Sequence, residues 1–328
     1  MSFQILSLSG GGYLGLYTAA VLAEIEEQTG RKMIDMFDLF AGTSIGGIIA
    51  LGLAGGVAAA EIRDAFLDNG EQIFGRSSPP TGIRKYLGYL GSAKAARYSA
   101  SPLRTTIVRI LGAETKIKDL RRPIVVTAVN LTKGGPKVFK TGHHARLMLD
   151  WRLNAVDVAL ATSAAPTYFP VHAIGDELFA DGGLFANSPD LIAVHEAEEF
   201  LDVASADLRL LSVGTTTTCF AFASNVPRSM GVADWVKDER LTSVIIGSQQ
   251  AITHDMMRHR LGERYLRIDR IQADAQRGEL ALDCASEGAK AVLKAMARAS
   301  FAEASGSDVL QSMLRHSAVD RPFVNASL

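Results

Sequence analysis

The stretch Ala41-Gly42-Thr43-Ser44-Ile45-Gly46-Gly47-Ile48-Ile49-Ala50 decides how this chain is expected to fold. An apolar segment precedes it and is typical of a buried strand, and a segment of small apolar residues follows it and is typical of a buried helix. A G-x-S-x-G motif between a strand and a helix holds its serine in a tight turn, with Oγ at the helix N-terminus. The stretch therefore predicts Ser44 as a nucleophile, with Gly42 and Gly46 forming the elbow. The alternative is an ordinary glycine-rich turn that packs a helix.

The uncharged segment 39–60 is long enough to span a bilayer and needs a separate interpretation. It contains several glycines and few large apolar side chains. We therefore expect a strand over 36–41 and a buried helix over 48–60, inside a core rather than a membrane.

Composition excludes several classes of protein. The chain has 328 residues, of which 48% are hydrophobic and 21% charged, and its formal net charge is −1. This balance argues against a disordered chain and against a surface that binds nucleic acid polymers. Cys219 and Cys284 are far apart in sequence, so neither a disulfide framework nor a zinc site is indicated. The N-terminus lacks the pattern of a signal peptide, and we expect a cytoplasmic protein.

A second glycine-rich turn lies near the N-terminus. An expected strand over 4–9 leads into Gly10-Gly11-Gly12-Tyr13-Leu14-Gly15, and a helical pattern then continues to about residue 28. Two successive strand–turn–helix units predict an α/β fold of three layers, α/β/α, with a mainly parallel central sheet.

The same glycines fit two kinds of function. Gly10-x-Gly12-x-x-Gly15 matches the dinucleotide fingerprint, which keeps a non-hydrolytic Rossmann protein as the alternative. That fingerprint needs an acidic residue at the end of the second strand, whereas Asp38 lies inside the expected strand. We favour the other use, in which the backbone N–H groups of Gly10, Gly11 and Gly12 face a developing oxyanion.

The rest of the chain continues the alternation of strands and helices. No internal repeat or low-complexity linker interrupts it, so we expect one domain over 1–304 and a weakly patterned tail over 305–328. Strands are expected over 122–131, 137–140, 177–180, 208–214 and 264–268, and helices over 58–69, 153–164, 190–200, 232–237, 241–261 and 285–302.

A basic stretch over 72–113 contains no Asp or Glu. Its basic residues are interleaved with aromatic and apolar ones, and they are Arg76, Arg84, Lys85, Lys94, Arg97, Arg104 and Arg109. A solvated helical face is one interpretation. Contact with anionic lipid head groups, or with an anionic regulatory ligand, is the other.

Three motifs together give a more specific assignment. Ser9-Gly10-Gly11-Gly12-Tyr13-Leu14-Gly15, Gly42-Thr43-Ser44-Ile45-Gly46 and Asp181-Gly182-Gly183 resemble, in order and spacing, the motifs of the patatin-like phospholipases. The stretch 163–170 resembles that family as well, and the resemblance covers about the first 270 residues. This sequence departs from the family pattern at Ser9, where the family usually has Asp, and at Leu14, where it usually has Arg or Lys.

The resemblance implies a phospholipase that cleaves acyl esters without a catalytic histidine, metal or cofactor. It implies Ser44 as nucleophile, Asp181 as its dyad partner, with Gly182 and Gly183 completing the dyad motif, and the 10–12 backbone as oxyanion hole. A carboxylate can accept the serine proton directly and return it to the leaving alcohol.

A Ser-His-Asp triad is the rival mechanism. His195 follows Asp181 in the chain order of α/β-hydrolases, but it lies in the middle of an expected helix, where a structural role is favoured. His172, His254 and His259 fit no catalytic pattern. The adjacent His143 and His144 lack partners at metal-ligand spacing, so no metal site is expected.

Within the family, the compact bacterial form resembles the phospholipase effectors of cyclic-oligonucleotide antiphage (CBASS) systems. That resemblance implies a membrane phospholipid substrate at the inner face of the membrane and a cyclic di- or trinucleotide activator. A homo-oligomer is possible, because the sequence does not determine the oligomeric state.

Overall fold

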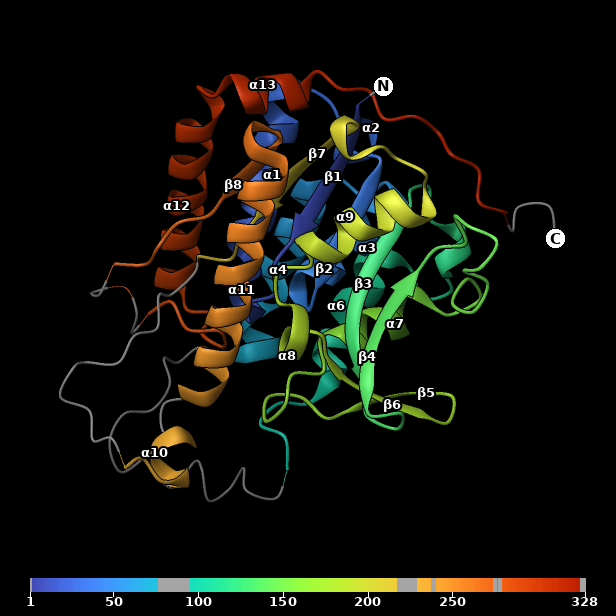
Figure 1. Ribbon diagram of the computed structural model, residues 1–328. Helices are drawn as coiled ribbons and strands as arrows, with labels where there is room; N and C mark the ends of the chain where they lie inside the picture. The colour runs from blue at the N-terminus through green and yellow to red at the C-terminus, as the bar shows by residue number, and fades with distance from the viewer. Residues whose placement is uncertain are drawn as a thin grey trace.

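A single mixed sheet lies at the centre of the molecule (Figure 1). The computed structural model describes residues 2–75, 95–216, 229–236, 240–273, 276 and 279–324. Within these residues the strand order is β5-β6-β3-β2-β1-β7-β8, with β4 paired to β3. The strands are β1 (Phe3–Leu8), β2 (Leu39–Thr43), β3 (Ile124–Asn130), β4 (Gly135–Lys140), β5 (His172–Ile174), β6 (Glu177–Asp181), β7 (Leu208–Val213) and β8 (Tyr265–Ile268). The pairs among β3, β2, β1, β7 and β8 are parallel, and those of β4, β5 and β6 are antiparallel.

Helices cover both faces of this sheet, which confirms the expected three-layer α/β fold. Helices α1, α3, α4, α6, α7 and α12 pack on one face, whereas α9 and α11 cover the face toward the viewer in Figure 1. The helices are α1 (Gly15–Thr29), α2 (Met33–Met36), α3 (Ile45–Gly55), α4 (Ala59–Phe74), α6 (Ala100–Leu111), α7 (Ala155–Thr162), α8 (Gly183–Ala186), α9 (Asp190–Phe200), α10 (Val232–Val236), α11 (Arg240–Leu261), α12 (Glu287–Ser305) and α13 (Asp308–Leu314).

The central strands are apolar on both faces, because helices bury both of them. In β1, Leu6 and Leu8 face the cluster around α1 and α3, and Phe3 and Ile5 face the cluster around α9. This alternation with a period of two residues is what a fully buried parallel strand requires.

Strand register brings three distant turns to one edge of the sheet. Leu8 at the end of β1 lies beside Gly42 in β2, so the turn after β1 is next to the turn after β2. Asp181, the last residue of β6, pairs with Ala128 of β3, close to the Thr43–Thr127 pair that joins β2 and β3. The carboxyl ends of parallel strands are where α/β folds place their sites.

Two element boundaries around the elbow differ from the expectation. The strand occupies Leu39–Thr43 rather than 36–41, because Met36 ends the short helix α2. Asp38 therefore precedes the strand instead of lying inside it, and its carboxylate accepts the Gln4 amide at 2.8 Å.

The helix after the elbow also differs, since 48–60 is not one helix. Helix α3 ends at Gly55, and Gly56 has φ of 94°, a left-handed conformation that ends a helix. Helix α4 continues to Phe74, beyond the expected end at residue 69. Gly70 lies inside this helix without breaking it. Glycine is needed there because a Cβ would lie 2.3 Å from Cε2 of the Tyr13 ring.

The C-terminal segment packs against the opposite, amino-terminal edge of the sheet. Within 305–328 the sequence pattern gave no helix, yet α13 buries Leu310, Met313 and Leu314. After α13, Val319 donates its amide to Asp38 at 2.9 Å, so this segment runs past the start of β2. None of the described helices is long and apolar enough to cross a membrane.

Candidate active site

Ser44 occupies a strained turn between β2 and α3. Its φ of 55° and ψ of −127° lie outside the regions that L-residues favour, which costs about 1–3 kcal/mol. Its amide donates to Thr162 Oγ1 at 2.9 Å, and its carbonyl accepts the Gly47 amide at 2.8 Å. The side chain is 8% exposed and lies at the N-terminus of α3, where the helix dipole favours negative charge.

The two elbow glycines leave no room for side chains. A Cβ at Gly42 would lie 2.2 Å from the carbonyl oxygen of Gly46. A Cβ at Gly46 would lie 2.4 Å from the carbonyl oxygen of Leu8 in β1. Both obstacles are backbone atoms, so the turn can close only with glycine at these positions.

Asp181 lies at the end of β6 and meets Ser44. Its carboxylate accepts a hydrogen bond from the Gly183 amide at 2.7 Å, and it lies near enough to the Ser44 hydroxyl for that donor to lower its pKa. Burial raises the pKa of Asp181 from 3.8 to about 6, although these two donors act to lower it. Asp181 is thus a stronger base than an ordinary aspartate and is still mostly ionised at neutral pH.

Gly182 brings the turn after Asp181 against β3. A Cβ at Gly182 would lie 2.2 Å from the Thr127 hydroxyl and 2.4 Å from the Thr127 carbonyl oxygen. A Cβ at Gly183 would meet the side chain of Asn187 at 2.9 Å. Small residues here let the carboxylate approach the elbow.

The first glycine loop lies against Ser44. A Cβ at Gly10 would lie 3.1 Å from Ser44 Cβ, so the loop passes directly beside the serine. The Gly10 amide already donates to the Asn187 carbonyl at 3.0 Å. The amides of Gly11 and Gly12 find no acceptor in the described part of the chain. Of the three amides predicted to form the oxyanion hole, only those of Gly11 and Gly12 therefore remain as candidate donors. The Gly10 amide is already used within the protein.

Gly15 has a packing role in this structure. A Cβ at Gly15 would lie 2.4 Å from Ile45 Cγ1, so the glycine allows α1 to cross close to the start of α3. The third glycine of the dinucleotide-like pattern thus joins the two strand–turn–helix units.

A small apolar hollow lies beside the elbow. Its volume is about 90 Å³, and it begins at Ser163 and Ala164, directly after the Thr162 that contacts Ser44. The Asp181 amide donates to the Ala164 carbonyl at 3.0 Å, so the end of β6 runs beside one wall of the hollow. Its lining comprises Ala100, Leu103, Leu160, Ser163, Ala164, Phe169, Pro170, Val171 and His172.

The histidines considered for a triad have other surroundings. His195 is exposed on α9, with its ring against Phe200. His254 Nε2 lies 3.1 Å from Ser188 Oγ, and burial lowers its pKa to about 4. His172 contacts Asp157, and His259 is exposed on α11. Across the described residues, no histidine is among the groups that shift the pKa of Asp181.

His143 is buried and contacts two polar side chains. Its Nε2 lies 2.9 Å from Glu196 Oε1, and its Nδ1 lies 2.8 Å from Thr141 Oγ1. Over the ranges that the structure describes, no group of His, Cys, Asp and Glu is arranged to hold a metal ion.

Much of the basic stretch 72–113 lies outside the described residues, including Arg76, Arg84, Lys85 and Lys94. The other three arginines each have an acidic partner. Arg97 pairs with Asp283, Arg104 with Asp157 and Arg109 with Asp68. Acids from outside the stretch thus neutralise the part that can be seen.

Three site residues escaped the sequence analysis: Thr162, Asn187 and Thr215. Thr162 accepts the Ser44 amide, and Asn187 and Thr215 both contact Gly10. In the sequence, the first ends a helix, the second caps one and the third follows a strand. Nothing local marks such residues, because their partners are distant in the chain.

Comparison with known proteins gives a consistent result. A family model described as patatin-like phospholipase matches residues 6–194. A Pseudomonas aeruginosa protein named cGAMP-activated phospholipase is 39% identical over 325 residues, covering 98% of this chain and 94% of that protein. Proteins of the same name from Escherichia coli and Vibrio cholerae are 38% and 36% identical, covering 87% and 86% of this chain and 84% and 86% of those proteins.

Proposed function

We propose that this chain, which belongs to the patatin-like phospholipase family, hydrolyses acyl esters of membrane phospholipids with a Ser44–Asp181 dyad. Family membership speaks against the dinucleotide-binding alternative. The observation that carries the proposal is that the Ser44 hydroxyl lies near enough to the Asp181 carboxylate to lower its pKa, at a strained turn beside the glycine loop. The Gly11 and Gly12 amides of that loop have no acceptor among the described residues.

In the proposed reaction Ser44 Oγ attacks the ester carbonyl carbon while Asp181 takes the hydroxyl proton. The amides of Gly11 and Gly12 donate to the oxyanion of the tetrahedral intermediate. The intermediate collapses to an acyl-serine, and Asp181 returns the proton to the departing lysophospholipid alcohol. Water then repeats the sequence, with Asp181 as base, and releases the fatty acid.

Substitution of the two side chains tests this assignment. Ser44→Ala and Asp181→Ala should each lower fatty-acid release from phospholipid vesicles by about 10³-fold or more, because each removes a group that bonds in the transition state. His195→Ala is the control and should keep the wild-type rate. A folded His195→Ala protein without activity would favour the triad instead.

An apolar surface next to the dyad supports a lipid substrate. Leu184, three residues after Asp181, is exposed on α8. Gln249 of α11 donates to its carbonyl at 2.8 Å, so α11 lies alongside. The outer face of α11 carries an exposed apolar stripe, opposite its buried face, formed by Leu241, Ile245, Ile252 and Met256.

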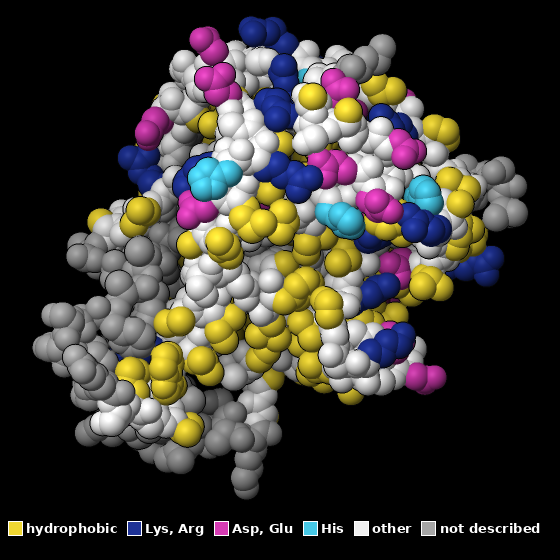
Figure 2. All heavy atoms as spheres, in the orientation of Figure 1, with side chains coloured by type: hydrophobic (Ala, Val, Ile, Leu, Met, Phe, Trp, Pro, Cys, Tyr) yellow, Lys and Arg dark blue, Asp and Glu magenta, His cyan; other side chains and the backbone are white. Residues whose placement is uncertain are grey.

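The distribution of charge agrees with this assignment. Figure 2 shows apolar side chains spread over the lower half of this face, whereas most charged side chains lie above them. We infer that the stripe and Leu184, here called the apolar face, rest on the bilayer and bring its lipids to Ser44. Burying exposed apolar side chains in a lipid interface is favourable by about 25 cal/mol per Å².

Charge introduced into the apolar face tests the inference. Ile245→Glu with Ile252→Glu should lower hydrolysis of vesicles by about tenfold or more, because two charges would have to enter the interface. Activity on a soluble short-chain ester should stay unchanged. Val319→Glu, at the opposite edge of the sheet, is the matched control. Equal losses on both substrates would count against docking through this face.

We further propose that a cyclic nucleotide activates the enzyme and that it serves as an antiphage effector at the inner face of the membrane. The support is the name cGAMP-activated phospholipase, carried by three relatives that the chain covers over most of their length. Adding cGAMP to the purified chain should raise vesicle hydrolysis, and a panel of cyclic di- and trinucleotides would establish selectivity. A rate that none of them changes would contradict this part of the proposal.

A further inference from the structure

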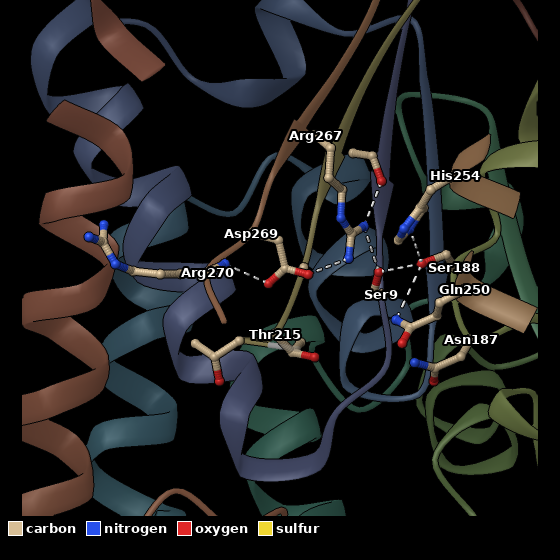
Figure 3. Close-up of polar contacts among 12 residues, drawn as sticks. Ser9, Asn187, Ser188, Thr215, Gln250, His254, Arg267, Asp269 and Arg270 are labelled. Atoms are coloured by element: carbon tan, nitrogen blue, oxygen red, sulfur yellow. Dashed lines mark hydrogen bonds and ion pairs between the residues drawn. The ribbon is translucent and has the colours of Figure 1, made fainter. Parts of the chain in front are cut away.

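The peptide bond between Gly10 and Gly11 is held from one side by two side chains. The Gly10 carbonyl accepts a hydrogen bond from Thr215 Oγ1 at 2.9 Å and another from Asn187 Nδ2 at 3.2 Å. Asn187 also binds the N–H of Gly10 itself, since the main-chain carbonyl of Asn187 accepts that N–H at 3.0 Å. Figure 3 shows Asn187 and Thr215 in different parts of the fold.

This arrangement fixes the Gly11 amide, although neither side chain touches it. A trans peptide is planar, so the carbonyl of Gly10 and the N–H of Gly11 belong to one rigid unit and point in opposite directions. Two donors that hold the carbonyl therefore aim the N–H away from Asn187 and Thr215. Hydrogen bonds to the carbonyl also polarise the peptide, which strengthens its N–H as a donor.

Glycine at residue 11 makes such external support necessary, because its backbone is conformationally permissive. Thr215 supports the loop by packing as well, since a Cβ at Gly11 would lie 2.6 Å from Thr215 Cβ. Gly10 is buried, and the loop receives these contacts from residues 177 and 205 positions away in sequence.

The residues next to Asn187 and Thr215 in the chain are themselves held in place. Ser188, next to Asn187, has its Oγ 2.8 Å from Ser9 Oγ, and Arg267 donates to Ser9 Oγ at 2.9 Å. Arg267 pairs with Asp269 at 2.7 Å. Asp269 lies against Gly214, where a Cβ would be 2.0 Å from its carboxyl group. Figure 3 shows this buried polar network between β8 and the start of the glycine loop.

We propose that Thr215 and Asn187 are positioning residues that aim the Gly11 amide at the oxyanion. This inference rests on the proposed hydrolase function and deepens it, because it says which side chains make the amide competent. The residues act through the Gly10–Gly11 peptide and do not contact the substrate.

Thr215→Val is the central test, because it removes the hydroxyl and keeps the shape that packs on Gly11. We expect kcat for a soluble ester to fall by about tenfold, the value of one neutral hydrogen bond, with KM and the melting temperature unchanged. Thr215→Ser restores the hydroxyl and should restore kcat to within about twofold. The matched control is Thr106→Val, which removes a buried threonine hydroxyl that donates to the Pro102 carbonyl in α6.

A transition-state probe separates positioning from general damage. A trifluoromethyl ketone forms an oxyanion adduct with a serine nucleophile, so its affinity should weaken in Thr215→Val by the same factor as kcat/KM. Asn187→Asp keeps the shape and replaces the donor by an acceptor, so it should lower kcat and ketone affinity together and by more than Thr215→Val.

Two results would overturn the inference while the proposed function stands. One is a Thr215→Val enzyme with wild-type kcat and ketone affinity, alongside an inactive Ser44→Ala. The other is a loss of kcat that follows the melting temperature and that Thr215→Ser does not rescue. A wild-type enzyme that neither hydrolyses esters nor binds the ketone would overturn the proposed function and this inference with it.

Discussion

The chain begins with two strand–turn–helix units, β1–α1 and β2–α3. Their glycine-rich turns lie side by side but are stabilised differently. In the β2–α3 turn, the atoms that exclude a side chain are backbone oxygens of Gly46 and of the adjacent β1 residue Leu8. In the β1–α1 turn, the neighbours of Gly10, Gly11 and Gly12 come from Asn187, Thr215 and Leu282.

The difference teaches how each turn is specified. The elbow follows mainly from a five-residue motif and its neighbouring strand, because the atoms that exclude side chains at Gly42 and Gly46 belong to the backbone. The glycine loop has no such local specification, because it is surrounded by residues from the second half of the chain, Asn187 and Thr215 through their side chains and Leu282 through its backbone. A change in the elbow should therefore affect folding, whereas a change in the loop should affect function first.

The largest expected effect comes from Gly46→Ala. Its Cβ would meet the Leu8 carbonyl oxygen at 2.4 Å, and a backbone strand cannot move aside. We expect a loss of about 3 kcal/mol or more in the free energy of unfolding, measured by urea denaturation.

Gly11→Ala is the matched variant in the other turn. Its Cβ would lie 2.6 Å from Thr215 Cβ, which side-chain rotation cannot move, so the loop must shift. Gly11 is only partly buried, so the loss of stability should be smaller than for Gly46→Ala, about 1–2 kcal/mol. Its activity should nevertheless fall strongly. Equal destabilisation by the two alanines would show that the turns are not specified differently.

The next effect concerns Asp181, which lies beside Ser44 of the elbow. Its pKa is about 6 in the folded protein and 3.8 ordinarily, so the folded state binds this proton more tightly than the unfolded state. Wild-type stability should therefore fall by about 3 kcal/mol as the pH rises from 3 to 7. Asp181→Asn should escape that fall, so its melting temperature should exceed that of the wild type at pH 7 and match it below pH 4.

The titration of Asp181 should also change the activity, which should rise with pH where the stability falls. The carboxylate is the proposed base, so kcat/KM should fall as the pH drops below about 6. A profile that stays level down to pH 4.5 would contradict a base with a raised pKa.

The smallest effect compares two inactive enzymes at the elbow. Ser44 has φ of 55°, a conformation that glycine adopts without strain and alanine does not. Ser44→Gly should therefore be more stable than Ser44→Ala by about 1 kcal/mol in urea denaturation. If Ser44→Ala is as stable as Ser44→Gly, the backbone strain at residue 44 does not contribute to the stability of the elbow.

The sequence predicted most elements of the fold because their hydrophobic patterns are local. Helix α9 was expected over the residues that it occupies, with Pro189 just before it. Boundaries around the elbow were missed, since Asp38 is buried by contacts with Gln4 and Val319, which lie far away in sequence. Helix α13 was missed because its three buried residues are too few to form a periodic pattern.

By itself the sequence determined an α/β fold, the family, and the turn that carries Ser44, because glycine spacing and strand–helix patterns act over short distances. Only the tertiary structure decided that the Gly10 amide donates to the Asn187 carbonyl and that burial raises the pKa of Asp181 to about 6. It also decided that the side chains of Thr215 and Asn187 donate to the Gly10 carbonyl. These properties depend on desolvation and on hydrogen bonds between segments brought together by strand pairing, and no local pattern encodes them.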